Sequence, residues 1–333
     1  MSYRPVSDDP EPERVRRITL LLLLADGTCL RPVDGGPALA TGDIAAGEHW
    51  LLDGVLRIPM QTHGFRAQGV HTVAVADLAD EPGALHLYGF ATGSPYRGTR
   101  EPHRPVRLEQ LTAEQLAGRL RAAGDPLARF VLDAAEAYRS QTDESVAADN
   151  LRWLQAAYLR AETPWGQSGK GGTYADWERS RRPVADAIDH DGTFLDVGCA
   201  NGYLMECVHA WCAERGLAVE PYGMDLGPEL VELARRRLPH WRDRLWVGNA
   251  QTWRPPDGRR FDFVQLRPDA VRPDRRPALL DHLRRAVLAA DGRLIVTLSE
   301  AGPSGSPRAL LQACGFSVTG ENGPVAWTDL PGD

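Results

Sequence analysis

Short apolar runs alternate with longer amphipathic stretches through the second half of the chain. The runs lie at residues 194–197, 219–225, 245–247, 261–266 and 293–298. Short runs of this kind are typical of parallel strands that are covered on both faces. The alternation predicts an α/β domain with a doubly wound sheet over residues 165–333. A helix at 307–314 and strands at 316–319 and 325–328 are expected to complete it.

The first of these runs leads directly into a glycine-rich turn and a helix. Gly198 and Gly202 allow a sharp turn and the close approach of a ligand to the backbone. From Tyr203 onward the apolar side chains have helical spacing, and Gly216 predicts the end of the helix. A glycine turn before a helix N-terminus can bind a nucleotide-like ligand through backbone N–H groups.

A carboxylate stands at the end of the second run. Asp225 follows Gly223, and Pro228 then opens a helix at a favoured first-turn position. Doubly wound folds place an acid here to accept hydrogen bonds from ribose hydroxyls, about 20 residues after the glycine loop. The alternative is an aspartate that only caps the helix.

The glycine turn has a recognisable motif. The dinucleotide pattern G-x-G-x-x-G fails, because it requires glycine at Ala200 and Tyr203. Asp196-x-Gly198-x-Ala200-x-Gly202 instead resembles the acid-x-G-x-G-x-G motif of class I S-adenosylmethionine (SAM) dependent methyltransferases, with alanine at the middle glycine. The resemblance extends over residues 165–333 and implies a Rossmann-like fold, SAM as cofactor and S-adenosylhomocysteine as product. An ordinary strand–helix corner is the alternative.

The resemblance also implies which residues contact the cofactor. Asn249 and Ala250 follow the third strand, where the family binds adenine. The stretch at 163–174 corresponds to an N-terminal lid, and Tyr174 at its end or the nearby Trp177 could lie against the sulfonium. A flexible linker is the alternative; a phosphate loop is excluded because no Ser or Thr follows Lys170. The full set of expected contacts is Asp196, Gly198, Cys199, Ala200, Asn201, Gly202, Asp225, Leu226, Asn249, Ala250, Gln265, Gln167, Ser168, Gly169 and Tyr174.

Catalysis by such a domain requires mainly positioning, because the methyl group of SAM is already activated. The protein must hold the acceptor in line with the methyl group and exclude water. The loop after the fourth strand is expected to meet the acceptor, and it lacks the N/D-P-P-Y/F sequence of amino-directed DNA methyltransferases. Arg267 could bind an anionic acceptor, and Asp269 or His240 could be a base. Each could equally be a solvated surface group.

The first third of the chain predicts a smaller α+β domain over residues 1–125. Strands are expected at 18–25, 70–75, 85–91 and 106–109, and helices at 50–60 and 112–120. The apolar run at 18–25 is far shorter than the ~20 residues of a membrane helix. It ends at Asp26-Gly27, a hairpin signal. A helical connector follows at 126–164, with a break near Thr142, and is expected to pack the domains together.

The layout of this first domain resembles a Nudix hydrolase, whose box reads G-x5-E-x7-R-E-x2-E-E-x-G. Gly42 and Glu48 fit its front, Gly64 and Phe65 fit its rear, and Arg57 fits the arginine if one residue is inserted. The acids that would hold Mg²⁺ are replaced by Ile58, Gln61 and Thr62. We therefore expect a non-hydrolytic module that binds acceptor or dimerises. An unrelated α+β domain is the alternative.

Composition narrows the class of function. The net charge of −7 argues against a broad surface for nucleic acid, although a local basic patch remains compatible with it. The five cysteines contain no C-x-x-C pair, the histidines form no ligand-spaced cluster, and residues 1–17 contain no signal-peptide core. We expect a cytoplasmic protein without disulfides, bound metal or membrane attachment.

Together these features predict a SAM-dependent methyltransferase that acts on a small-molecule acceptor in specialised metabolism. A homodimer would be compatible with the two-domain layout. The alternatives are a tRNA or protein methyltransferase, and a non-catalytic regulator that only binds SAM.

Overall fold

The chain folds into two compact units, Met1–Asp149 and Asn150–Asp333. The structure is a computed structural model, and it describes residues 4–5, 14–48, 53–95, 106–169, 173–298 and 306–330. Within these residues, none of the helices has the length and apolar character needed to cross a membrane.

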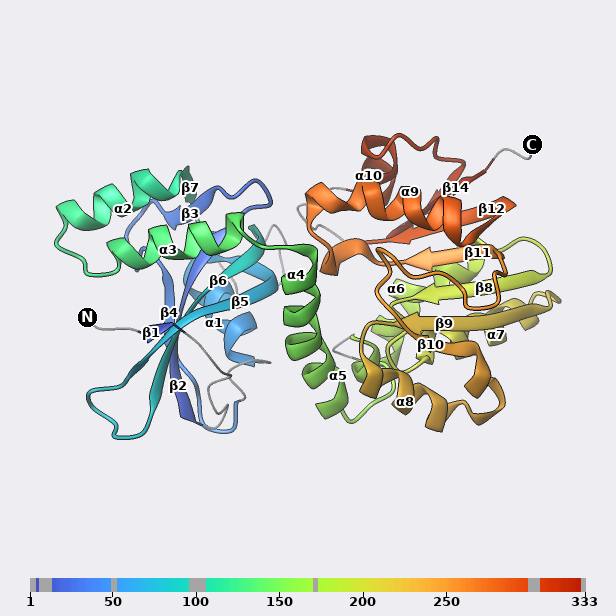
Figure 1. The fold of residues 1–333 in the computed structure, drawn as a ribbon, viewed down its shortest axis with the longest axis horizontal. Helices are drawn as coiled ribbons and strands as arrows, with labels where there is room; N and C mark the ends of the chain where they lie inside the picture. Colours follow the sequence, from blue (N-terminus) through green and yellow to red (C-terminus); the bar gives the residue numbers. More distant parts are fainter. Residues whose placement is uncertain are drawn as a thin grey trace. The chain divides into compact units, whose positions relative to one another are not determined.

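The N-terminal unit is a mixed sheet with helices on both faces (Figure 1). Strand β2 lies parallel to β6 and antiparallel to β3 and β4, and the sheet order is β1-β5-β6-β2-β3-β7. The elements are β1 (Arg4–Pro5), β2 (Val15–Leu23), β3 (Cys29–Pro32), β4 (Ala40–Asp43), α1 (Val55–His63), β5 (Phe65–Asp77), β6 (Leu85–Pro95), β7 (Leu108–Leu111), α2 (Ala113–Ala122) and α3 (Ala128–Arg139).

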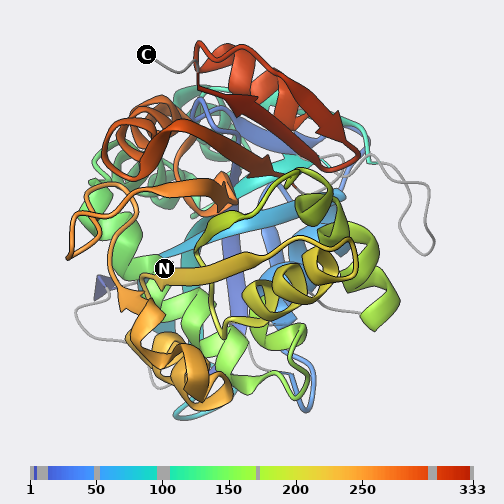
Figure 2. The ribbon, with the colours of Figure 1, turned by 90° about the vertical axis from the view of Figure 1, so that its right-hand side faces the viewer.

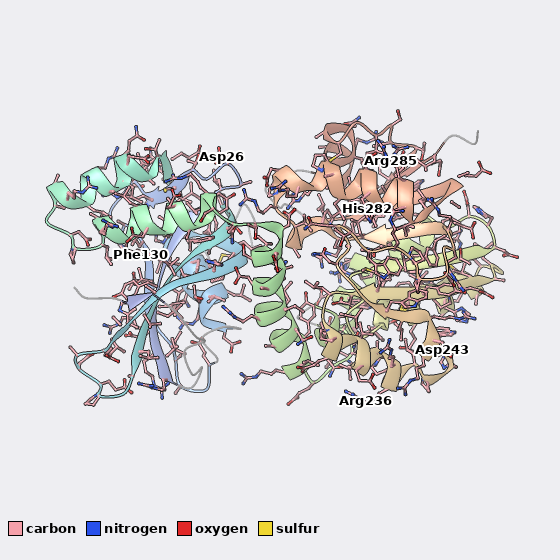
Figure 3. The ribbon with its side chains drawn as sticks, in the orientation of Figure 1. Asp26, Phe130, Arg236, Asp243, His282 and Arg285 are labelled. Carbon is pink, nitrogen blue, oxygen red and sulfur yellow. The ribbon has the colours of Figure 1, made fainter. Side chains whose placement is uncertain are left out.

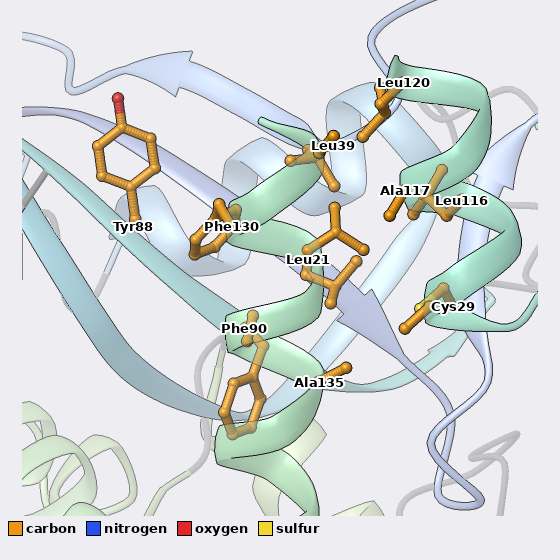
Figure 4. Close-up of a cluster of buried hydrophobic side chains, with 14 of the residues drawn as sticks. Leu21, Cys29, Leu39, Tyr88, Phe90, Leu116, Ala117, Leu120, Phe130 and Ala135 are labelled. Carbon is orange, nitrogen blue, oxygen red and sulfur yellow. The ribbon is translucent and has the colours of Figure 1, made fainter. Parts of the chain in front are cut away.

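Helices α2 and α3 cover one face of this sheet through a continuous apolar cluster (Figure 4). Leu21 of β2 and Phe90 of β6 pack there against Phe130 and Ala135 of α3. The Tyr138 hydroxyl donates to the Ala25 carbonyl oxygen over 2.8 Å, which ties the end of α3 to the β2–β3 turn. Helix α3, which we expected in the connector, therefore buries its apolar face inside the N-terminal unit.

Most predicted elements of this unit are present, with shifted ends. The turn at Gly27 has a φ of 82°, and β2 and β3 pair antiparallel around it. The helix expected at 50–60 begins later, at Val55, and residues 49–52 lie outside the described residues. Asp53 and Gly54, directly before this helix, have a π-helical conformation. The Nudix resemblance itself stays a prediction.

A helical segment follows α3 after a break at residues 140–142, close to the predicted one. It consists of α4 (Asp143–Asn150), a π-helical turn η3 (Leu151–Gln155) and α5 (Ala156–Arg160). The π turn adds a residue to the helical path and re-aims the side chains beyond it. This places Gln155 and Tyr158 near the carboxyl edge of the second sheet, as described below.

The C-terminal unit is a sheet of order β10-β9-β8-β11-β12-β14-β13. Strands β8 to β12 are parallel, and β14 is antiparallel to both of its neighbours. The elements are a 3-10 turn η4 (Gly166–Ser168), α6 (Tyr174–Asp186), β8 (Gly192–Val197), α7 (Tyr203–Ala213), β9 (Val219–Asp225), α8 (Pro228–Arg237), η5 (Pro239–Arg244), β10 (Leu245–Val247), β11 (Phe261–Leu266), η6 (Pro268–Ala270), η7 (Pro273–Arg275), α9 (Arg276–Ala286), β12 (Leu288–Thr297), α10 (Pro307–Ala313), β13 (Gly320–Asn322) and β14 (Val325–Asp329).

Successive side chains of β8 point to opposite faces of this sheet, as in any strand. Leu195 packs on the side of α9 and α10, and Phe194 packs on the side of α6 and α7. Figures 1 and 2 show the helices on the two sides of the strands. The predicted three-layer α/β domain is thus confirmed.

Two details of the tail differ from the prediction. The strand expected at 316–319 is an irregular segment whose Phe316 and Val318 pack on the core, and β13 lies further on at 320–322. Strand β12 begins at Leu288 rather than at 293. The pairing of β11 with β12 shifts register around Asp291, so the predicted turn residues form an irregularity inside one strand.

Candidate functional site

The strand order reverses at β8, whose neighbours β9 and β11 lie on opposite sides of it. At such a switch point the loops after the strands separate and leave a crevice at the carboxyl edge, where doubly wound folds bind ligands. Asp196 of β8 is in register with Gly223 of β9 and Gln265 of β11. Three predicted site residues, Asp196, Asp225 and Gln265, therefore end adjacent strands at this edge.

The glycine turn after β8 is held in a left-handed conformation. Gly198, Ala200 and Gly202 have φ values of 85°, 47° and 75°. Among the residues that the structure describes, Ala200 is the one non-glycine residue with a positive φ. Such a conformation costs an L-residue roughly 1–2 kcal/mol. The alanine in the motif is therefore a strained position rather than a neutral replacement.

The backbone amides of this turn mostly have partners inside the protein. Those of Gly198 and Cys199 donate to the Met224 carbonyl oxygen over 2.8 and 3.0 Å, and that of Ala200 donates to Asp225 Oδ2 over 2.8 Å. The Gly202 amide donates to the Cys199 carbonyl oxygen. These four N–H groups bind within the protein, and ligand binding through backbone N–H groups of the turn stays a prediction.

The turn also has open space beside Gly198. A Cβ added at Gly198 would meet nothing within 4 Å, whereas one at Gly202 would lie 2.7 Å from Leu238 Cδ1. Gly202 is thus required by packing against α8. Gly198 leaves room for a ligand to approach the backbone.

Asp225 performs the capping role and is also placed for a ligand. Its Oδ1 accepts the Gly227 amide over 2.8 Å, while its Oδ2 holds the amide of the glycine turn. Burial raises the pKa of Asp225, and the backbone N–H groups that it accepts oppose that rise. Because a carboxylate can accept about four hydrogen bonds, both oxygens keep acceptor capacity for a ligand.

Asp196 is buried deeper at the same edge, with a side chain 2% exposed. Burial and, second, the charge of Asp225 raise the pKa of Asp196 to about 7, and the positive charge of Arg181 opposes the shift. Arg181 is itself buried and stacks over the Trp177 ring at 5.2 Å. Two carboxyl groups that disfavour each other's ionisation would be stabilised by a positively charged ligand.

Gln265 carries an unsatisfied acceptor. Its Nε2 donates to Thr297 Oγ1 over 3.3 Å, while its Oε1 is buried without a hydrogen-bond partner among the described residues. A buried polar group without a partner costs about 1–3 kcal/mol, so native proteins rarely leave one without reason. A ligand donor at this position would satisfy it.

The predicted lid also lies at this edge. We call residues 161–169, between α5 and α6, the strap. Gln167 uses both ends of its amide within the protein: Nε2 donates to the Ala161 carbonyl oxygen over 3.0 Å, and Oε1 lies 3.3 Å from Asn201 Nδ2. Gln167 therefore holds the strap together instead of facing a ligand. The neighbouring Ser168 ends the short η4 turn, and Gly169 follows with a left-handed φ of 79°.

The two aromatic candidates at the sulfonium differ in placement. Tyr174 is 41% exposed, and its ring packs edge-on against Trp165 of the strap at 6.0 Å. Trp177 is fully buried in the core between α6 and α7. Tyr174 thus remains a candidate, whereas the prediction for Trp177 is wrong because its ring is part of the core.

The loop after β10 packs beside the end of β9. The Gly248 amide donates to the Asp225 carbonyl oxygen over 2.9 Å. Asn249 Oδ1 accepts the Gln251 amide over 3.0 Å, which fixes the loop. Asn249 and Ala250 are half-buried, as is Leu226 directly after Asp225. The residues expected around adenine are thus adjacent at the edge of the sheet.

The expected acceptor loop begins at Arg267, directly after β11. It is anchored by the buried Arg276, whose Nε donates to the carbonyl oxygens of Pro268 and Val271, each over 3.1 Å. Asn150 Nδ2 donates to the Ala270 carbonyl oxygen over 2.8 Å. The loop is therefore held in place. The side chain of Asp269, a candidate base, lies outside those that the structure describes.

His240 belongs to η5, the short 3-10 segment that follows α8. Figure 3 labels Arg236 in α8 and Asp243 in η5. The ring of His240 packs on that of the adjacent Trp241 at 4.4 Å, and Trp241 packs on His209 of α7. These contacts do not test the role of His240 as a base, which stays a prediction.

Two residues at the site were missed in the sequence. Gln155 Oε1 accepts the Glu229 amide over 3.2 Å at the start of α8, next to Gly227. Arg237 donates to the Asn201 carbonyl oxygen over 2.9 Å and to Glu206 over 2.8 Å. Gln155 has no motif around it, and Arg237 ends a run of three arginines, so neither had a distinguishing signal.

In the described part of the chain, no three His, Cys, Asp or Glu side chains gather to hold a metal ion.

Comparison with known proteins agrees with this geometry. Residues 194–292 match the model of a family described as a methyltransferase domain. No curated protein sequence matches the chain. Similar solved structures include a SAM dependent methyltransferase from Aquifex aeolicus, with 16% identity, 51% of this chain and 100% of that chain covered and a TM-score of 0.37.

Two further structures each match about half of both chains. Phosphoethanolamine N-methyltransferase 1 from Haemonchus contortus has 13% identity, 57% of this chain and 50% of that chain covered and a TM-score of 0.40. Geranyl diphosphate C-methyltransferase from Streptomyces coelicolor A3(2) has 17% identity, 48% and 51% covered and a TM-score of 0.29. Likenesses this low carry no conclusion about substrate.

The glycine motif, the acid after β9, the reversal of strand order at β8 and the family match agree with one another. Residues 194–292 therefore form a methyltransferase domain of the class I type, with S-adenosylmethionine as its cofactor.

Proposed function

We propose that the protein transfers the methyl group of SAM to a small-molecule acceptor. The observation that carries the cofactor assignment is the set of acceptors at the switch point: Asp196, Asp225 and the unpartnered Oε1 of Gln265. SAM brings complementary groups, namely a sulfonium, an α-ammonium and two ribose hydroxyls. When bound, it supplies an activated methyl group.

In this proposal the acceptors divide between two parts of the cofactor, the ribose and the ammonium. The remaining acceptor capacity of Asp225 takes the ribose hydroxyls, since it lies at the end of β9 beside the loop of Asn249 and Ala250. Asp196 and Gln265 take the ammonium, which offsets the burial of both groups. Gly198 lets the ligand lie against the backbone, because a Cβ there would project into open space.

The acceptor is proposed to enter at the anchored loop that begins with Arg267. An arginine at this place suits an acceptor that carries a carboxylate or phosphate group. The net charge of −7 favours a small acceptor over RNA, and a metabolite of specialised metabolism would fit. A tRNA or protein methyltransferase, or a regulator that binds SAM without turnover, is the alternative.

The N-terminal unit is proposed to be a non-hydrolytic module that binds acceptor or joins two copies of the chain. The carboxylate of Glu48, which fits the front of the Nudix box, binds Arg57 with two hydrogen bonds of 2.5 and 2.7 Å instead of a metal ion. Ile58 is buried and cannot bind a metal, and Thr62 Oγ1 donates to the Ile58 carbonyl oxygen. Incubation with Mg²⁺ and nucleoside diphosphate sugars should therefore release no phosphate product. Metal-dependent turnover would overturn this part of the proposal.

Calorimetric titration with SAM and S-adenosylhomocysteine tests the core of the proposal, after a check for co-purified cofactor. Asp225→Ala should weaken binding by about 1.5–3 kcal/mol, because ribose hydroxyls lose a charged acceptor. Asp257→Ala, which removes an exposed carboxylate that pairs with Arg259, is the matched control and should bind normally. Thermal melting of both variants separates lost affinity from lost fold, since Asp225 also caps two backbone amides.

Unchanged affinity in folded Asp225→Ala would remove Asp225 from the site. Conversion of SAM to S-adenosylhomocysteine with a metabolite extract would distinguish an enzyme from a regulator. Binding to RNA that is strongly weakened at high salt would instead favour a tRNA substrate.

A further inference from the structure

The side chain of Asn201 attaches the strap at residues 161–169 to the glycine turn. Asn201 is fully buried, and its Nδ2 donates to the Pro164 carbonyl oxygen over 2.9 Å and lies 3.3 Å from Gln167 Oε1. Its Oδ1 accepts the Tyr203 amide over 3.1 Å at the start of α7. Both ends of the amide are therefore occupied, and its orientation is fixed.

The strap is rigid within itself. The Gln167 side chain donates to the Ala161 carbonyl oxygen, and Thr163 Oγ1 accepts the Gly166 amide over 3.1 Å. Gly169 ends the strap in a left-handed conformation, and a Cβ there would overlap the hydroxyl of Tyr158. A segment with this internal structure can move as one piece when its attachment to the turn is released.

The backbone of Asn201 is fixed separately, from α8. Arg237 donates to the Asn201 carbonyl oxygen over 2.9 Å, and the same guanidinium holds Glu206 of α7 over 2.8 Å. Because the backbone position is set by Arg237, the Asn201 side chain is left to hold the strap. A series of contacts thus runs from α8 through the glycine turn to the strap.

We propose that Asn201 is a positioning residue that closes the strap over the cofactor and sets the rate at which the cofactor leaves. This inference rests on the proposed function of the site. It also changes the role that the motif implies for Asn201, from a direct cofactor contact to an attachment point. Both Nδ2 donors of Asn201 are used within the protein, so a ligand acceptor could take them only by displacing the strap.

Asn201→Asp separates these two roles. The variant keeps Oδ1 for the Tyr203 amide, so the cap of α7 is preserved. It replaces the Nδ2 donor by an oxygen that faces two acceptors, the Pro164 carbonyl and Gln167 Oε1. The attraction to the strap thereby becomes a repulsion.

A matched control is Asn322→Asp on β13. Asn322 Nδ2 donates to Asp186 Oδ2 over 2.9 Å at an exposed position, so the same chemical change occurs outside the strap and the glycine turn. A second test variant is Gln167→Ala, which removes the other strap partner and the bond to Ala161 without altering the turn.

Two measurements test the inference. The first is hydrogen exchange of strap peptides in the cofactor-free protein. The second is the dissociation rate of S-adenosylhomocysteine by stopped flow. Asn201→Asp should raise both by roughly tenfold, the equivalent of one lost hydrogen bond, and Gln167→Ala should change both in the same direction. Asn322→Asp should leave both unchanged.

Unchanged exchange of the strap in Asn201→Asp would overturn the inference. So would faster exchange with an unchanged dissociation rate, because the strap would then not retain the cofactor. Failure of the wild-type protein to bind any cofactor would instead refute the proposed function, and the exchange measurement would still decide whether Asn201 holds the strap.

Discussion

Replacing Gly198 or Gly202 by alanine should damage the protein in two different ways. Both glycines have a positive φ, 85° and 75°, so alanine is strained at either position by about 1–2 kcal/mol. They differ in what the added methyl group would meet. At Gly198 it would enter open space, and at Gly202 it would press on Leu238, with Ala234 at 3.4 Å.

The expected magnitudes follow from that difference. In Gly198→Ala the strain alone should lower the free energy of unfolding, by about 1–2 kcal/mol. Gly202→Ala adds overpacking against α8, so its total loss should be roughly 2–5 kcal/mol. The order reverses for cofactor affinity. The methyl group at 198 would occupy the space through which the ligand approaches, so binding should weaken by at least about tenfold, or ~1.4 kcal/mol.

The assay is urea unfolding together with calorimetric titration of S-adenosylhomocysteine, on both variants and the wild type. Urea midpoints and slopes report stability, and the titration is made where each variant is folded. Wild-type affinity in Gly198→Ala would refute the assignment of the open space to the cofactor. Equal stability of the two variants would refute the packing argument at Gly202.

Two further outcomes follow from the same edge of the sheet. Ala200→Gly should stabilise the C-terminal unit by roughly 0.5–1 kcal/mol in thermal unfolding, because it relieves the strain at φ 47° but adds chain entropy to the unfolded state. Ala210→Gly, at an exposed position in α7, should instead destabilise by about 1 kcal/mol; similar losses in both would contradict the strain argument. Since the pKa of Asp196 is raised to about 7, the group is neutral below that pH and charged above it. Affinity for the ammonium-bearing S-adenosylhomocysteine should therefore rise with pH through this range, by up to about tenfold per pH unit, in calorimetric titrations; a flat profile would show that Asp196 does not face the ammonium.

The sequence alone predicted the elements that depend on local pattern. Strands at 245–247 and 261–266 were placed at their observed bounds, because a short apolar run between turn residues leaves few alternatives. The turn at Gly198 and Gly202 and the acid after β9 were also identified, since each follows from a single residue type at a fixed distance from a strand end. These features, with the strand order, were sufficient to indicate the class of methyltransferase.

Errors arose where residues distant in the sequence compete for the same space. Helix α3 was assigned to the connector, although its apolar face belongs to the first sheet. Trp177 was considered for the ligand, but it fills the core between two helices. Residue type and helical spacing do not distinguish a side chain in the core from one at the surface or in the site, so the sequence could not assign these residues.

There is a physical reason why the sequence determined some features and the tertiary structure determined others. Backbone conformation is decided within a few residues, so the sequence by itself determined most strands, the turn after β8 and the glycine motif. Partners of a side chain are decided by which elements pack together. Only the tertiary structure therefore showed that Asn201 binds the strap 37 residues away, that Gln265 Oε1 is left without a partner among the described residues, and that the charges of Asp196 and Asp225 oppose each other.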